Sequence, residues 1–178
     1  MRIVREWILA IALFVALVLD GSLSLYLHQF MVYGSYNSAC LFVPIGIMLI
    51  ALFDDTNKRE IWLALGTGIV ADLYFLGIIG VYSVFLPLVC WACQRLARFL
   101  PEVFWARLIV VLAGVIILSI YSWIILSMVG MISISDHLML ISLIPTLIWS
   151  SIFTVLTYWI WGNLAQDYPF MINLDAYR

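Results

Sequence analysis

Long apolar runs separated by short polar turns are the feature that most constrains the fold of this chain. Hydrophobic residues make up 66% of its 178 residues and charged residues only 10%, whereas soluble domains are near half apolar and a quarter charged. A domain of this size cannot hide so much apolar surface from water, so lipid must be the solvent for most of it. We therefore predict a single all-α membrane domain over residues 1–178.

The apolar block from Ile61 to Phe99 decides how many crossings there are. It is far too long for one crossing of about 20 residues, and the glycines at 77 and 80 mark the natural break near its middle. We expect either a hairpin of two full spans or a shorter hairpin that reaches only partway. Pro44 is expected to kink the span before this block. The chain then has about six spans, at residues 7–31, 36–53, 61–76, 81–99, 105–131 and 138–162.

The basic residues predict the orientation, because Lys and Arg gather on the cytoplasmic side of membrane proteins. With the N-terminus inside and six crossings, all 8 Lys and Arg residues fall in the inner segments. An odd number of spans breaks this pattern. We therefore expect a multi-pass protein of the cytoplasmic (inner) membrane, with both termini in the cytoplasm.

Two carboxylates, Asp20 and Asp72, fall inside predicted spans. An Asp at the centre of a membrane helix opposes insertion by about 2.5–3.5 kcal/mol, so such residues usually face a bundle interior or a wet cavity. Each is a candidate for function, or else is protonated or hydrogen-bonded at a helix break. Gly68 shares a helix face with Asp72 and would let another backbone come close. Gly77 and Gly80 permit a sharp turn after it.

Two other patterns are less specific. Ala12 and Ala16 form a small-xxx-small pair that could contact a neighbouring helix, or could simply pack inside the bundle. Cys90 and Cys93 form a C-x-x-C pair without a second pair or a nearby histidine, so we interpret them as packing residues. No series of intramembrane charges and no basic patch accompanies these motifs. We therefore expect no catalytic site, no metal ion, no cofactor and no nucleic-acid partner.

The segment from Gly68 to Tyr82 resembles the signature of MreD, a family of bacterial rod-shape-determining membrane proteins. Members carry a glycine one turn before an Asp, an apolar residue or Tyr after it, and one or two glycines that open the next span. The matching positions here are Gly68, Asp72, Leu73, Tyr74, Gly77 and Gly80. The Asp20-Gly21 pair is similar to versions from Gram-positive bacteria. Chain length and span number also fit, so the resemblance covers nearly the whole chain.

This resemblance implies a non-enzymatic membrane scaffold of the elongation (rod) complex, which builds side-wall peptidoglycan and so controls cell shape. The implied partners are an MreC-like single-span protein, the actin-like MreB, a SEDS glycosyltransferase, a class B transpeptidase and membrane lipid. Asp72 and Asp20 would organise the interior or a partner groove. The family fold is similar to the substrate-binding components of energy-coupling-factor vitamin transporters. Such a component is the alternative function, in which Ala12 and Ala16 would meet the coupling partner.

Overall fold

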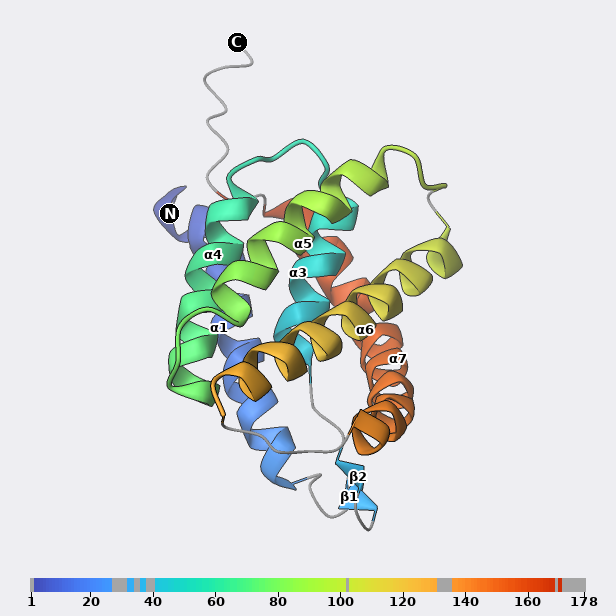
Figure 1. Ribbon diagram of the computed structural model, residues 1–178. Helices are drawn as coiled ribbons and strands as arrows, with labels where there is room; N and C mark the ends of the chain where they lie inside the picture. Colours follow the sequence, from blue (N-terminus) through green and yellow to red (C-terminus); the bar gives the residue numbers. More distant parts are fainter. Residues whose placement is uncertain are drawn as a thin grey trace.

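The computed structural model describes residues 2–26, 32–33, 36–37, 41–101, 103–130, 136–168 and 170. These residues form a helical bundle with one short antiparallel pair of strands (Figure 1). The elements are α1 (Arg2–Tyr26), β1 (Val32–Tyr33), β2 (Tyr36–Asn37), α3 (Phe42–Phe53), α4 (Glu60–Ala71), a turn of π-helix η1 (Asp72–Leu76), α5 (Tyr82–Ala97), α6 (Phe104–Met128) and α7 (Asp136–Asp167). The helical membrane bundle predicted from the sequence is confirmed.

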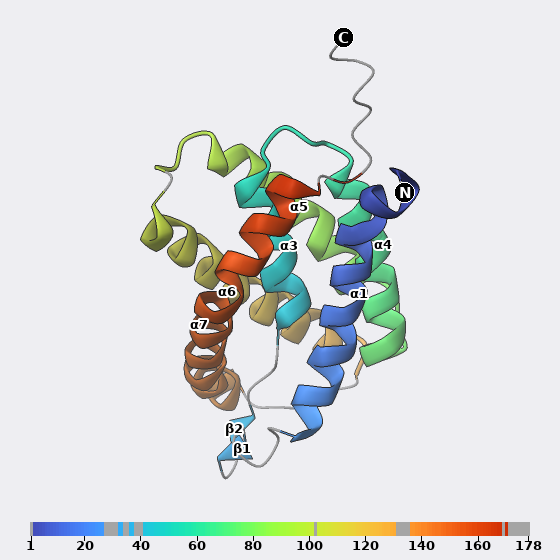
Figure 2. The same ribbon diagram turned by 180° about the vertical axis from the view of Figure 1, so that it is seen from behind.

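Helix α3 forms the centre of the bundle. Helices α1, α5, α6 and α7 all pack against it, and it lies between its neighbours when the bundle is viewed from either side (Figures 1 and 2). Every residue from Val43 to Leu52 is buried, because a helix that is apolar all round must be covered on every side. Pro44 stands in the first turn of α3, where a proline removes no helical hydrogen bond. The predicted kink at Pro44 is therefore wrong, since the helix begins only at Phe42.

Successive helices run in opposite directions, so the N-terminus of α1 and the C-terminus of α7 lie at the same end of the bundle (Figure 1). The turn between η1 and α5 and the β1–β2 pair lie at the other end, which we call the turn end. We call the first end the basic end. Its described Lys and Arg residues are Arg2, Arg5, Lys58, Arg59, Arg95, Arg98 and Arg107.

Three of the described helices are long and apolar enough, by length and composition, to cross a membrane. These are Trp7–Ser24 within α1, Phe104–Met128, and Leu140–Asp167 within α7. Helix α3 has 12 residues, or about 18 Å, against a hydrocarbon core of about 30 Å. Helix α5 has 16 residues, or about 24 Å. The residues that precede these two shorter helices, Leu41 and Val81, are buried, so the first backbone N–H groups of both helices need acceptors from the protein itself.

The helix bounds differ from the predicted spans in several places. Helix α3 begins at Phe42 rather than near residue 36, because residues 36 and 37 belong to β2. Helix α7 continues to Asp167, past the predicted end at 162. The predicted ends at 31 and 131 lie outside the described residues. The number of full membrane crossings stays a prediction.

Close packing of α3 against α7 depends on Gly46. A Cβ atom at Gly46 would lie 2.7 Å from Cζ2 of Trp161, a rigid and buried ring. We expect Gly46→Ala to unfold more easily than Gly66→Ala by about 1–3 kcal/mol, because an added atom in a filled core forces its neighbours apart. Gly66 is the matched control, since no atom of the described part of the chain lies within 4 Å of a Cβ built there. The measurement is the free energy of unfolding in mixed micelles, and equal values for the two variants would contradict the prediction.

Candidate functional site

Asp72 binds the beginning of α5 through its carboxylate. The residue is fully buried. Its Oδ1 accepts a hydrogen bond from the backbone N–H of Tyr82 at 2.7 Å, and its Oδ2 accepts from those of Gly80 at 2.9 Å and Ser83 at 3.0 Å. Tyr82 and Ser83 are the first residues of α5, whose N–H groups have no partner within the helix. The helix dipole also favours a negative group at this position. Asp72 therefore caps α5 from the helix that precedes it.

The turn between η1 and α5 depends on two glycines with positive φ. Gly77, at φ +68°, ends η1, and its N–H donates to the carbonyl oxygen of Asp72 at 2.8 Å. Gly80 has a φ of +139°, a conformation that residues with a side chain rarely adopt. The carbonyl oxygen of Gly80 accepts a hydrogen bond from the hydroxyl of Tyr121 in α6 at 3.0 Å. The turn is thus held by Asp72 on one side and by α6 on the other.

Gly68 lets the backbones of α4 and α5 meet one turn before Asp72. A Cβ atom at Gly68 would lie 2.6 Å from the carbonyl oxygen of Tyr82 and 2.7 Å from Cα of Ser83. Both are backbone atoms, which cannot rotate away as a flexible side chain can. A side chain at position 68 would therefore move α4 away from the beginning of α5 and stretch the hydrogen bonds to Asp72.

Asp20 occupies the corresponding place at the beginning of α3. It is only 3% exposed, and it accepts hydrogen bonds from the backbones of Phe42 and Val43, the first two residues of α3. Its Oδ1 has no hydrogen-bond partner among the described residues. Both carboxylates singled out from the sequence therefore cap the helix that follows them in the bundle. Neither the pairing of Asp20 with α3 nor this shared role was predicted.

The remaining residues of the predicted motifs lie in two different environments. Leu73 and Tyr74 are more than half exposed on η1. A Cβ atom at Gly21 of α1 would lie 2.9 Å from the hydroxyl of Tyr74, so these two residues are in close contact. Ala16 is buried in the core and Ala12 packs against that core. The small-xxx-small pair of α1 therefore contacts the chain's own helices.

The two cysteines of the C-x-x-C pair lie in α5. Cys90 and Cys93 are both free and buried, and both belong to the apolar core cluster. Within the part of the chain that the structure describes, no three His, Cys, Asp or Glu residues are placed to hold a metal ion.

A second buried polar cluster, at the basic end, was not predicted. Asn57, Glu60 and Gln94 are each no more than 7% exposed. The side-chain amide of Gln94 donates to Oε2 of Glu60 at 3.3 Å and to the carbonyl oxygen of Asn57 at 3.0 Å. The amide of Asn57 donates to the carbonyl oxygen of Phe170 at 2.8 Å. The cluster thus ties the α3–α4 loop to α5 and to the segment after α7. The available sequence signal was Gln94, because a polar side chain in an apolar helix needs a partner.

Glu60 carries a proton in this cluster. It belongs to the polar stretch 54–60 between two predicted spans. Burial raises the pKa of Glu60 from 4.5 to about 9, and the negative charge of Asp54 adds to the shift, while the hydrogen bond from Gln94 opposes it. Between pH 4.5 and 9 the folded state therefore binds a proton that the unfolded state has released. Stability falls as the pH rises through this window.

Fold and site together define a polytopic membrane bundle in which buried carboxylates cap short inner helices. The chain matches the family model of the rod shape-determining protein MreD over residues 1–166. It therefore belongs to the MreD family, as the resemblance in the Gly68–Tyr82 segment predicted. Membership implies a role in determining rod shape, in association with the elongation complex, and the family is one of membrane proteins that determine shape rather than a family of enzymes. Comparison with curated proteins and with solved structures found no match.

Replacing Asp72 tests the cap on α5. We expect Asp72→Leu to lose about 3 kcal/mol or more of unfolding free energy, because three partly buried N–H groups lose their acceptor at about 1–3 kcal/mol each. We expect a smaller loss for Asp72→Asn, since an amide oxygen can accept two of these bonds while its NH₂ group opposes the third. The measurement is unfolding in mixed micelles. A wild-type value for Asp72→Leu would show that the cap contributes nothing to stability.

The proton on Glu60 predicts how stability depends on pH. From pH 6 to 9 the unfolding free energy of the wild type should fall by up to about 1.4 kcal/mol per pH unit, because only the folded state keeps this proton. Glu60→Gln is neutral at every pH and should give a flatter profile. Unfolding titrations at several pH values provide the measurement, and an equally steep profile for Glu60→Gln would assign the pH dependence to other groups.

Proposed function

We propose that this protein is a non-enzymatic membrane scaffold of the rod complex. It binds an MreC-like single-span protein and helps to position peptidoglycan synthesis. The observation that carries the proposal is the match to the MreD family model over residues 1–166. A SEDS glycosyltransferase, a class B transpeptidase and, where the organism has it, MreB are the further members of the proposed complex.

The geometry of the predicted motif supports a structural use of Asp72. Its two oxygens accept three backbone hydrogen bonds, so the carboxylate serves to hold the α4–α5 hairpin in one arrangement. Gly68, Gly77 and Gly80 fix the close approach and the turn of that hairpin. Leu73 and Tyr74 lie next to Asp72 but are exposed. They are the part of the motif that a partner helix can reach.

We place the basic end of the bundle on the cytoplasmic side of the inner membrane, because Lys and Arg gather on that side. The turn end then faces outward, on the side where peptidoglycan is built. Asp20 and Asp72 lie toward the turn end of the bundle, where α3 and α5 begin. Both carboxylates thus stabilise the end of the protein that is closest to the wall.

The alternative, a substrate-binding component of a vitamin transporter, finds no support in the comparisons. In that function Ala12 and Ala16 of α1 would have met a coupling partner. Ala16 is instead buried in the chain's own core, with Ala12 packed against it.

The test is a tagged purification from membranes in mild detergent, with co-purifying proteins identified by mass spectrometry. We expect an MreC-like single-span protein together with wall synthases. Recovery of a transmembrane coupling protein with paired ATPases would overturn the scaffold function.

Two variants connect this experiment to the motif. Tyr74→Ala removes an exposed aromatic ring and should lower partner recovery at least about fivefold, since interface aromatics are often worth more than 1 kcal/mol. Ile117→Ala, on the exposed face of α6, is the control and should leave recovery unchanged. Wild-type recovery and normal cell shape in both Tyr74→Ala and Asp72→Leu would reduce the motif to internal packing.

A further inference from the structure

We propose that a groove between α1 and α4 binds an anionic phospholipid of the cytoplasmic leaflet. One acyl chain lies in the groove and the phosphate headgroup lies at the basic end. This inference goes beyond the scaffold function and does not depend on any protein partner. It rests on the orientation proposed above and on three observations: the shape of the groove, the apolar character of its walls, and the charges at its mouth.

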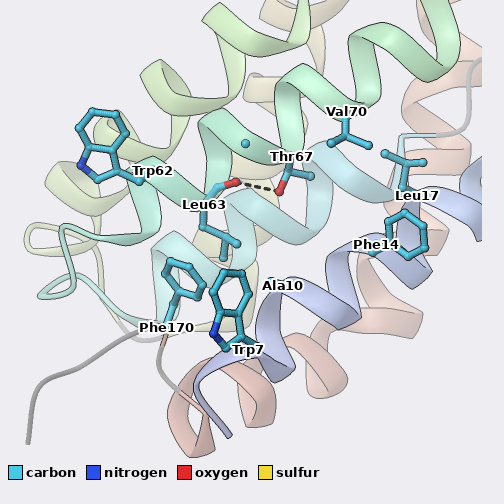
Figure 3. A pocket seen from close by; sticks show the side chains of 10 residues that line it. Trp7, Ala10, Phe14, Leu17, Trp62, Leu63, Thr67, Val70 and Phe170 are labelled. Carbon is cyan, nitrogen blue, oxygen red and sulfur yellow. Dashed lines mark hydrogen bonds between the residues drawn. The ribbon is translucent and has the colours of Figure 1, made fainter. Parts of the chain in front are cut away.

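The groove is a cavity of about 380 Å³ between the two helices. Large side chains form its walls and small residues leave its centre open (Figure 3). Trp7 of α1 and Trp62 of α4 flank one end, with Phe170 between them. Ala10 and Gly66 are small residues on the two facing helices, and a Cβ atom built at Gly66 would meet nothing within 4 Å. Among the described residues, therefore, none fills the space next to Gly66.

The lining side chains of the groove carry polar atoms only at Thr67 and at the indole nitrogens of Trp7 and Trp62. The hydroxyl of Thr67 donates to the carbonyl oxygen of Leu63 at 2.8 Å, as the dashed line in Figure 3 shows. Phe14 and Val70, which also line the groove, are exposed apolar side chains. A hydrocarbon chain suits such a surface, because it needs no hydrogen bond from the walls and gains van der Waals contact with the rings.

Both helices that form the groove begin with basic residues at the same end. Arg2 and Arg5 lie in the first turns of α1, and Lys58 and Arg59 directly precede α4. Lys58 is exposed. Trp7 follows the basic residues of α1 and Trp62 follows those before α4, and both line the groove. Tryptophan is enriched at the level of the lipid headgroups in membrane proteins. Basic pockets between membrane helices on the cytoplasmic side bind anionic headgroups.

The acidic residues of the nearby loop have their own partners within the protein. Asp54 accepts hydrogen bonds from the backbone and hydroxyl of Thr56. Asp55 forms an ion pair with Arg98 of α5 at 3.2 Å, and the Glu60 side chain is buried. Asp54 keeps its negative charge, but the basic residues Arg2, Arg5, Lys58 and Arg59 outnumber it at this end of the two helices. The mouth of the groove therefore combines a net positive charge with an apolar interior. An anionic phospholipid is complementary to both parts, whereas a purely apolar helix would match only the interior.

Lipid retention by the purified full-length protein tests the proposal. The protein is titrated with phosphatidylglycerol or with phosphatidylcholine of the same acyl chains, and bound lipid is counted by native mass spectrometry. We expect phosphatidylglycerol to bind at least about fivefold more tightly, the ratio that corresponds to about 1 kcal/mol for one basic residue near a headgroup. Equal binding of the two lipids would overturn the proposal.

Groove-filling variants locate the site. Gly66→Leu should abolish tight binding, and Ala10→Leu fills the groove from the opposite helix as a second variant. Ala113→Leu, on the exposed face of α6, is the matched control and should bind as the wild type does. Unfolding midpoints show that each variant is folded. Unchanged phosphatidylglycerol binding in both groove variants would overturn the proposal, as would loss of a protein partner from Gly66→Leu while lipid binding persists.

Charge variants test the headgroup. Lys58→Gln should weaken phosphatidylglycerol binding about fivefold and leave phosphatidylcholine binding unchanged. Arg95→Gln removes one positive charge from the same end of the bundle but from α5, where Arg95 lies over the ring of Trp91. It is the matched control. Equal weakening by the two variants would indicate general attraction to the basic end and would overturn a headgroup site at this groove.

Discussion

The backbone N–H groups at the beginnings of the short inner helices are the constraint on which the rest of this structure depends. Helices α3 and α5 begin in buried surroundings, and in lipid or in an apolar core an unsatisfied N–H group costs several kcal/mol. The chain meets this constraint with one carboxylate for each helix, Asp20 for α3 and Asp72 for α5. A carboxylate suits the position because it offers several acceptor sites and its negative charge matches the positive end of the helix dipole.

These two caps explain much of the surrounding packing. Asp72 can reach the beginning of α5 only because Gly68 lets the backbones of α4 and α5 touch. At the opposite end of the same hairpin, Gln94 links α5 to the loop that leads into α4 through Asn57 and Glu60. The α4–α5 hairpin is thus tied at both ends by polar contacts inside an otherwise apolar bundle. The proposed scaffold function needs such a fixed arrangement, because a partner or a lipid can bind only if the outer helix faces keep their relative positions.

The physical reading of the two carboxylates also limits what they can do. A carboxylate that accepts three backbone hydrogen bonds, as Asp72 does, is committed to structure, and this suits the shape-determining role of the MreD family. The groove between α1 and α4 has the opposite character, since no described side chain fills the space next to Gly66. The interior carboxylates therefore stabilise the bundle, whereas the groove offers a surface to the surrounding lipid.

Features set by local sequence could be predicted, and features set by the pairing of distant segments could not. The length of the apolar block from Ile61 to Phe99 predicts a hairpin, and its glycines mark the turn, because hydropathy and backbone freedom are properties of neighbouring residues. Membership of the MreD family could likewise be predicted from the short segment around Asp72. The partner of Asp20 could not, because the N–H groups that it binds belong to α3 and come within reach only when α1 packs beside that helix. The burial of Glu60 and the groove between α1 and α4 likewise depend on which distant segments pack together.

Sequence by itself determined which segments are helical and where a polar group is unexpected. Tertiary structure alone decided what each polar group meets, since hydrogen bonding and burial depend on which helices become neighbours.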